Sequence, residues 1–417
     1  MTRQTDFLII GGGAAGTTAA GVIRTLNPNA KITILSGENY RLYSRVLLPN
    51  YIRGEITREQ LFLKNPMWYR ENQIELVGNS KAAKLIPDQK KVELANGETF
   101  LYKKLLIATG ASPIRLNVPG ADLENISYMW TIGDADTIIE AAKTAKRGVI
   151  IGGGFIGLEF AHSFKEKGIE TVILEGAPYY WGTRLDEKSS RVLRNLLEAN
   201  GIKVVAGDQV QEFEGRTLKR VVGTVKTKSG KKYEADLVGI GIGIRNDLEW
   251  LNDSGMKIDG GIVTNEYLET SIPDVYAAGD CVSFYDLIIQ VPHIVGTWGN
   301  ATTQGAVVAK TMCDVRTAFE AVSAYTINFF GSSCSFIGMT EEDFVDEIVV
   351  RGSVEDSKIT RIFVKKYNSQ TRIVGATVIN NPAEVSPLTT AVKNRVDIAS
   401  HKDRLSDLSF DLKQLIG

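Results

Sequence analysis

Cysteine and histidine are scarce in this chain of 417 residues, which contains three of each. Cys281, Cys313 and Cys334 lie far apart, and no two of them form a Cys-x-x-Cys pair. Three thiols cannot bind an iron–sulfur cluster through four thiolates, and the histidines are too scattered for a metal site. We therefore expect no metal. The low cysteine content fits a reducing compartment.

The chain also lacks long apolar runs and an excess of charge of one sign. Its net charge is −1, with 48 Lys and Arg against 49 Asp and Glu, so nucleic acid is not an expected partner. No apolar run is long enough to cross a bilayer, and we expect no transmembrane segment. Without a signal peptide, the expected location is cytoplasmic. The length suggests two or three domains.

Glycine, in contrast, is abundant, and the first cluster of glycines forms a dinucleotide-binding fingerprint directly after apolar residues 7–10. The first glycine allows a tight turn, the second lets a pyrophosphate approach the backbone, and the third lets helix and strand pack closely. The phosphates would lie at the helix N-terminus, where free N–H groups favour negative charge. The residues expected to hold them are Gly11, Gly13, Ala14, Ala15 and Gly16.

A second fingerprint, formed by Gly152, Gly154 and Gly157, follows apolar residues 149–151. One such cluster can be a mere glycine-rich turn, but two copies in one chain indicate two bound dinucleotides. Glu175 ends the next strand, where a carboxylate accepts hydrogen bonds from both ribose hydroxyls and repels a 2′-phosphate. The second site is therefore predicted to take NADH rather than NADPH.

The acidic residue of the first site comes later in the sequence. The strand predicted at 32–35 ends before Ser36, and the acid that follows is Glu38. Glu38 is the predicted ribose ligand, and Ser36 is the alternative.

Each half of the chain also contains a later apolar strand that ends in small residues. The first, residues 105–110, ends in Thr109 and Gly110, and the second, residues 237–243, includes Gly241. Fingerprint, acid and late strand thus recur in the same order, which indicates a duplicated architecture built on parallel sheets.

One more apolar strand, predicted at residues 275–278, leads through a glycine to Asp280. A carboxylate at this end of a strand lies where ligands bind in open parallel sheets. The alternative is that Asp280 only caps a helix.

After about residue 320 the pattern changes. Residues 325–330, 361–364 and 373–379 resemble antiparallel strands, and a helix is expected near Pro387. This part is predicted to be a small α+β domain.

In their order, the two fingerprints, the two late strands and the Asp280 motif resemble the FAD-dependent pyridine nucleotide–disulfide oxidoreductase superfamily over essentially the whole chain. The resemblance implies an α/β fold with two Rossmann-like domains and a small C-terminal α+β domain. The implied bounds are 1–115 and 242–322 for a discontinuous FAD domain, 116–241 for an inserted NAD domain and 323–417 for the C-terminal domain. It also implies FAD at the first fingerprint and NADH, as a co-substrate, at the second.

The resemblance further implies roles for single residues. Asp280 would contact the ribityl chain or pyrophosphate of FAD. Glu159 would lie near the flavin where nicotinamide stacks; alternatively, it is a carboxylate in the first turn of a helix, favoured by the helix dipole. Trp298 would lie beside the isoalloxazine ring, with buried packing as the alternative.

The stretch 40–50 contains no cysteine, although disulfide reductases of this superfamily carry a redox-active pair there. In this respect the chain resembles the cysteine-free branch: ferredoxin and rubredoxin reductases and the flavin domain of assimilatory nitrite reductases. Tyr43 and Arg45 match a tyrosine–arginine pair of that branch, which places Arg45 near FAD. Asn50 stands where ferredoxin reductases commonly have a lysine near flavin N5.

We therefore expect an FAD-dependent NADH:acceptor oxidoreductase that passes hydride from NADH to FAD and electrons to an external carrier such as ferredoxin or rubredoxin. Basic residues outnumber acidic ones between residues 31 and 70, so a positive face could steer an acidic carrier; the alternative is a mixed-charge surface. Other candidate functions are an NADH oxidase or diaphorase, an NADH-sensing flavoprotein, and a flavin subunit of a larger, nitrite reductase-like redox complex. The small C-terminal domain mediates dimers in disulfide-reductase relatives, so the resemblance leaves open both a homodimer and a monomer.

Overall fold

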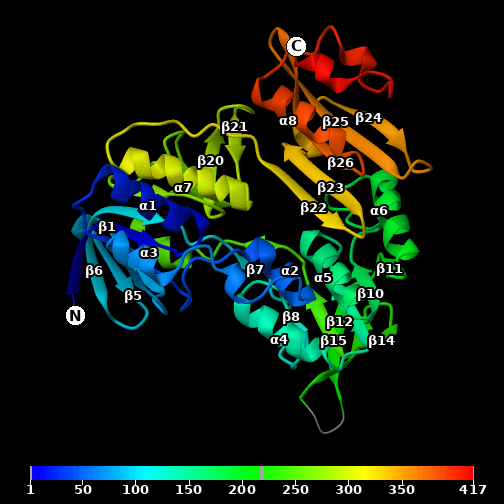
Figure 1. Ribbon diagram of the computed structural model, residues 1–417, viewed down its shortest axis with the longest axis horizontal. Coiled ribbons are helices and arrows are strands. Elements are labelled where there is room, and N and C mark those ends of the chain that lie inside the picture. The colour runs from blue at the N-terminus through cyan, green and yellow to red at the C-terminus, as the bar shows by residue number, and fades with distance from the viewer. Residues whose placement is uncertain (1, 217–219, 417) are drawn as a thin grey trace. The chain divides into compact units, whose positions relative to one another are not determined.

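The computed structural model describes residues 2–216 and 220–416, and its chain divides into two compact units (Figure 1). The first unit consists of Met1–Ser44, Arg58–Ser112 and Ile244–Ser323. The second consists of Arg45–Thr57, Pro113–Gly243 and Ala324–Gly417. The division into three domains, with the bounds given above, stays a prediction.

A mainly parallel sheet forms the core of the first unit. Its strands β1, β2, β3 and β6 are parallel, and β5 and β4 extend it in antiparallel fashion. Residues 7–10 and 32–35 are buried throughout, as expected for strands covered on both faces. The order across the sheet is β3 (Ile74–Val77), β2 (Ile32–Leu35), β1 (Thr2–Ile10), β6 (Thr99–Ile107), β5 (Lys91–Leu94) and β4 (Ala82–Ile86).

Strand β19 (Val275–Ala277), distant in the sequence, completes this sheet by pairing in parallel with the C-terminal part of β6. Helices α1 (Ala14–Leu26) and α7 (Trp298–Met312) lie side by side against it (Figure 1), and α3 (Pro66–Glu71) contacts β3. A smaller sheet of the same unit contains β17 (Ile258–Asp259), β18 (Gly261–Thr264), β20 (Val282–Asp286) and β21 (Val291–His293).

The second unit contains a five-stranded parallel sheet. Each fingerprint thus follows a strand of a parallel sheet, and the expected α/β class is confirmed. Its order is β11 (Lys203–Ala206), β10 (Glu170–Glu175), β9 (Arg147–Ile151), β15 (Leu237–Ile240) and β8 (Ile126–Ser127). Its helices are α2 (Leu48–Arg53), α4 (Ile132–Ala142), α5 (Phe155–Glu166) and α6 (Glu187–Ala199). An antiparallel sheet of β12 (Val210–Gly215), β13 (Val222–Thr227) and β14 (Lys232–Glu234) adjoins it. Short strands β7 (Ser112–Pro113) and β16 (Ile244–Arg245) occur where the chain passes between units.

The C-terminal part of the second unit is an antiparallel sheet covered by helix α8 (Val385–Lys393), which confirms the expected α+β domain (Figure 1). Pro387 lies inside the first turn of α8, where its missing N–H leaves no helical bond unmade. β23 and β24 were not expected from the sequence. The strand order is β22 (Ala324–Phe329), β23 (Ser332–Gly338), β26 (Gln370–Ile379), β25 (Lys358–Tyr367) and β24 (Glu347–Ser353).

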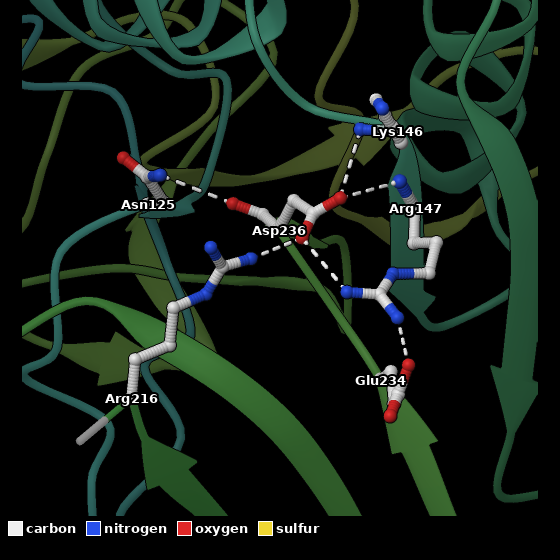
Figure 2. Close-up of polar contacts among 6 residues, drawn as sticks. All are labelled: Asn125, Lys146, Arg147, Arg216, Glu234 and Asp236. Carbon is white, nitrogen blue, oxygen red and sulfur yellow. Dashed lines mark hydrogen bonds and ion pairs between the residues drawn. The ribbon is translucent and has the colours of Figure 1, made fainter.

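A carboxylate, drawn with its partners in Figure 2, lies where β9 and β15 of the second unit's parallel sheet begin, which is the end of β9 opposite the fingerprint. Asp236 precedes β15, and its side chain accepts hydrogen bonds from the backbone N–H groups of Lys146 (2.8 Å) and Arg147 (2.9 Å). The guanidinium groups of Arg147 and Arg216 also contact this carboxylate. These hydrogen bonds lower the pKa of Asp236 against an opposing effect of burial.

We predict that Asp236→Asn destabilises the protein at pH 7 by about 1.5–3 kcal/mol, because an amide cannot accept all the bonds that the carboxylate accepts. Since the folded-state pKa is lowered, the contribution of Asp236 is present above its unfolded-state pKa and is lost as pH falls through the folded-state value. Urea unfolding followed by circular dichroism should therefore show a large variant effect at neutral pH and a small one in acid.

The control is Asp122→Asn, because the Asp122–Arg220 ion pair is exposed and should contribute less than about 1 kcal/mol. Equal effects of the two substitutions would contradict a special role for Asp236.

Candidate functional site

At two glycines of the first fingerprint, neighbouring backbone lies so close that no side chain would fit. Gly11 has a φ of +120°, and a Cβ there would lie 2.0 Å from the carbonyl oxygen of Ala108. A Cβ on Gly16 would lie 2.0 Å from the carbonyl oxygen of Gly11. In contrast, a Cβ on Gly13 would meet no described atom within 4 Å. The turn therefore leaves open space at the glycine where a pyrophosphate is expected to approach.

Helix α1 begins at Ala14, and its N-cap residue Gly13 provides no side-chain cap. The first backbone N–H groups of a helix need acceptors from elsewhere, and a phosphate supplies them. Gly13, Ala14, Ala15 and the adjoining open space thus fit a bound dinucleotide.

Asp280 is positioned by the approach of α7 to α1. A Cβ on Gly305 of α7 would lie 2.4 Å from the carbonyl oxygen of Ala15, so the two helices are nearly in backbone contact. The buried Gln304 accepts a 2.7 Å hydrogen bond from the N–H of Gly279, the residue before Asp280. Asp280 precedes strand β20, not a helix, so the helix-cap alternative for this residue is wrong.

Trp298 is the first residue of α7, after the N-cap Thr297. Its side chain is half-buried and packs against the core of the first unit. Packing therefore accounts for part of its surface, and its place beside a flavin stays a prediction.

The two predicted ribose ligands of the first site occupy different places. Ser36 is buried, and its Oγ lies 3.2 Å from the position of a Cβ on Gly12. Glu38 is half-buried and accepts a 2.8 Å hydrogen bond from the hydroxyl of Tyr43. Tyr43, predicted as part of a tyrosine–arginine pair, thus orients the carboxylate predicted to bind the ribose.

The second fingerprint repeats the geometry of the first. Gly152 has a φ of +96°, and a Cβ there would lie 2.3 Å from the carbonyl oxygen of Gly241. A Cβ on Gly157 would lie 2.1 Å from the carbonyl oxygen of Gly152. The carbonyl oxygen of Gly241 thus lies against Gly152 in the same way as the carbonyl oxygen of Ala108, next to Thr109 and Gly110, lies against Gly11. This close approach requires a glycine at positions 11 and 152.

Glu175 occupies the place in the second site that Ser36 occupies in the first. The residue is 9% exposed, and its carboxylate accepts hydrogen bonds from the N–H groups of Gly153 and Ala177, both at 3.0 Å. Each carboxylate oxygen retains a further lone pair, so the group can also accept from two ribose hydroxyls. The geometry fits the predicted role.

Glu159 lies in the second turn of α5, and that helix has no acidic residue in its first turn. The alternative of a first-turn carboxylate stabilised by the dipole is therefore wrong. Burial raises the pKa of Glu159 to about 7, while the guanidinium of Arg53, 3.3 Å away, opposes that rise. Glu55 and Tyr325 also face this group.

Arg53 was not singled out by sequence reasoning. It lies one helical turn after Asn50 on α2, and its side chain is only 8% exposed. Asn50 is uncharged. Its amide donates a 2.6 Å hydrogen bond to Glu55, which in turn pairs with Arg53. The positive charge that faces Glu159 is that of Arg53, and the sequence did not indicate it because the pair forms only where α2 packs on α5.

Arg45, predicted to lie near FAD, is the first residue of the second unit. Its guanidinium donates to the carbonyl oxygen of Trp130 and lies 5.2 Å from the centroid of the Trp130 ring. Its contact with a cofactor stays a prediction.

The basic stretch 31–70 is less open than its composition suggests. Arg41 pairs with Glu59 and stacks on Phe62, and Arg53 pairs with two carboxylates. These contacts favour the mixed-charge alternative over a positive face.

The described cysteines form no disulfide, and Cys281 and Cys334 are buried. Burial raises the pKa of Cys281 to about 11 and raises that of Cys334 as well, so neither is a reactive thiolate. Within residues 2–216 and 220–416, no three His, Cys, Asp or Glu side chains are grouped so as to hold a metal ion. No helix in the described part of the chain has the length and apolar character needed to span a membrane.

Two dinucleotide-binding folds in one chain are typical of an oxidoreductase that couples a flavin to a nicotinamide. A family model described as pyridine nucleotide-disulphide oxidoreductase matches residues 5–305, and the chain belongs to this family. It is therefore an NAD(P)H-dependent flavin oxidoreductase.

Comparisons with single proteins lead to the same class. The chain is 29% identical to nitrite reductase [NAD(P)H] of Bacillus subtilis over 94% of its own length, but it spans only 48% of that protein. It is 27% identical to putidaredoxin reductase of Pseudomonas putida, covering 100% of this chain and 98% of the relative. The structure matches putidaredoxin reductase in its covalent complex with putidaredoxin, with a TM-score of 0.91, 27% identity and coverage of 99% and 98% of the two chains.

We predict that Arg53→Met shifts the titration of Glu159 to a pH above 7. Burial raises the pKa of Glu159, and the substitution removes the guanidinium that opposes this rise. Infrared difference spectra against Glu159→Gln, recorded as a function of pH, would follow the protonated carboxyl band. Arg53→Lys keeps the charge and should titrate close to the unaltered protein. A band that titrates identically in all three proteins would contradict the assignment of this ion pair.

Proposed function

We propose that this protein is an NADH:acceptor oxidoreductase that holds FAD at the first fingerprint, receives NADH at the second and passes electrons to a small carrier protein such as ferredoxin or rubredoxin. The observation that carries the proposal is the repeated fingerprint geometry with unequal residues at the ribose position. In the second site Glu175 presents a carboxylate that two backbone N–H groups hold in place, whereas Ser36 stands at the matching place in the first.

The chain's own residues would bind and orient. The open space at Gly13 and the uncapped start of α1 would accept the FAD pyrophosphate, and Asp280 would hold the ribityl chain or the same phosphates. Glu175 would select NADH, because a buried carboxylate held by two backbone N–H groups repels a 2′-phosphate. The flavin, when bound, accepts hydride from NADH and releases electrons to the acceptor.

The choice of a carrier protein as acceptor rests on the relatives and on the thiols. Putidaredoxin reductase, similar over the full length of both chains, was crystallised with putidaredoxin. The stretch 40–50 holds no cysteine, and the two buried thiols have raised pKa values. Electrons would therefore leave the flavin directly. A partner redox subunit is the second candidate acceptor, because the nitrite reductase relative is about twice as long as this chain.

Glu175→Ala and Asp280→Ala test the two cofactor assignments against each other. Loss of the Glu175 hydrogen bonds should weaken NADH binding about 10- to 100-fold, as for hydrogen bonds that involve a charged group, and leave the FAD content unchanged. Asp280→Ala should lower the fraction of purified protein that carries FAD. Calorimetric titration with NAD⁺ and the flavin-to-protein absorbance ratio measure these effects. Unchanged NAD⁺ affinity in Glu175→Ala would refute the second assignment.

Stopped-flow reduction of the FAD-loaded protein by NADH, followed by mixing with ferredoxin, rubredoxin, a quinone or oxygen, tests the acceptor. We expect at least one carrier protein to reoxidise the flavin about tenfold faster than oxygen does. Oxygen or quinone as the fastest acceptor would instead indicate an oxidase or diaphorase. Slow reduction with a persistent long-wavelength absorbance band would indicate an NADH-sensing flavoprotein.

A further inference from the structure

A tryptophan that sequence reasoning did not single out lies over the second fingerprint. The indole Nε1 of Trp181 is 3.6 Å from the position that a Cβ on Gly154 would occupy, and Cε2 is 3.8 Å from it. Gly154 is the N-cap of α5 and provides no side-chain cap. The polar edge of the indole therefore borders the space that the second glycine of a fingerprint leaves for a pyrophosphate. At Gly13, the matching residue of the first site, no described atom borders this space within 4 Å.

Trp181 is held in this place by a cluster of aromatic rings within the second unit. Its ring lies 4.7 Å from that of Phe155, in an edge-to-face arrangement, and 5.2 Å from that of Phe336. Phe155 in turn contacts Tyr325 at 4.8 Å. The side chain is 4% exposed, and its backbone has a φ of +52°, a conformation that costs free energy for a bulky residue. Packing fixes the ring but gives no partner to its N–H.

The indole N–H is a donor only, so a ligand that it binds must offer an acceptor. In the described residues 2–216 and 220–416 no group accepts a hydrogen bond from this N–H, and its nitrogen is not fully buried. The neighbouring Tyr180 is different, because its ring fills the space beside Gly153, 2.7 Å from the position of a Cβ there. Protein thus occupies the space at Gly153, whereas the space at Gly154 is bordered by a donor that lacks a protein acceptor.

We propose that Trp181 is a dinucleotide-binding residue whose indole N–H donates a hydrogen bond to the pyrophosphate bound at the second fingerprint. The inference rests on the proposed function in that it takes NADH as the occupant of this site. It adds a side-chain donor to the backbone N–H groups of α5. A hydrogen bond to a charged acceptor of this kind contributes a factor of about 10 to 100 in affinity.

The test compares Trp181→Phe with the unaltered FAD-loaded protein by calorimetric titration with NAD⁺, ADP-ribose and AMP. Phenylalanine keeps an aromatic ring against Phe155 and Phe336 but removes the N–H. We expect NAD⁺ and ADP-ribose to bind about 10- to 100-fold more weakly, and AMP, which has no pyrophosphate, to be affected much less. Flavin content and thermal stability should stay close to those of the unaltered protein.

Two control variants separate hydrogen bonding from packing. Phe336→Leu disturbs the same aromatic cluster without removing the donor and should change NAD⁺ affinity little. Trp250→Phe, in the first unit, should leave it unchanged. If Trp181→Phe and Phe336→Leu lost equal amounts of NAD⁺ affinity, Trp181 would act only through packing, and the proposal would be overturned.

A second measurement does not depend on any variant binding the ligand. In ¹⁵N-tryptophan-labelled protein, the indole signal absent from Trp181→Phe identifies Trp181, and its proton resonance should move downfield when NAD⁺ or ADP-ribose is added. An unmoved signal at saturation would overturn the proposal.

The remaining outcomes distinguish this inference from the proposed function. If Glu175→Ala weakens NAD⁺ binding and Trp181→Phe does not, the inference fails and the proposed function stands. If Trp181→Phe binds NAD⁺ more tightly, the indole obstructs the site and the inference is overturned. If neither variant alters NAD⁺ binding, the assignment of NADH to this fingerprint fails as well.

Discussion

In each unit the fold depends on one contact between a glycine and the carbonyl oxygen at the end of a neighbouring late strand. At Gly11 and at Gly152 a single methyl group would lie within 2.0–2.3 Å of that oxygen. A larger residue would have to push helix and sheet apart, and the first N–H groups of α1 or α5 would move with the helix. Close backbone approach, more than any side-chain contact, therefore determines where a pyrophosphate could be bound.

This dependence explains which features could be predicted from the sequence. Glycines, small residues and the strand-ending Glu175 act through backbone geometry over a short stretch of chain, and their spacing is visible in the sequence. Arg53 and Trp181 could not be found in this way, because their roles follow from α2 packing on α5 and from aromatic side chains on β22 and β23. Glu159 was recognised, but its distance from the helix start depended on where α5 begins.

Two carboxylates of the second unit are held by different kinds of hydrogen-bonding partner. Glu175 is fixed by two backbone N–H groups, which cannot be titrated and do not move independently of the strand and turn that carry them. Glu159 depends on one arginine side chain, and its pKa lies near 7 because that partner only partly offsets desolvation. The first group is suited to constant recognition of a ligand, whereas the charge of the second responds to its surroundings.

The late pairing of β19 with β6 has a consequence for synthesis on the ribosome. The C-terminal part of β6 ends at Ile107, but β19 begins only at Val275, after all the strands of the second parallel sheet have been made. Until then the nascent chain has an unpaired apolar strand edge, of the kind that invites wrong pairing. The emerging polypeptide thus contains the complete parallel sheet of the second unit before its N-terminal sheet can close, which makes this interval the period in which a chaperone would protect it most.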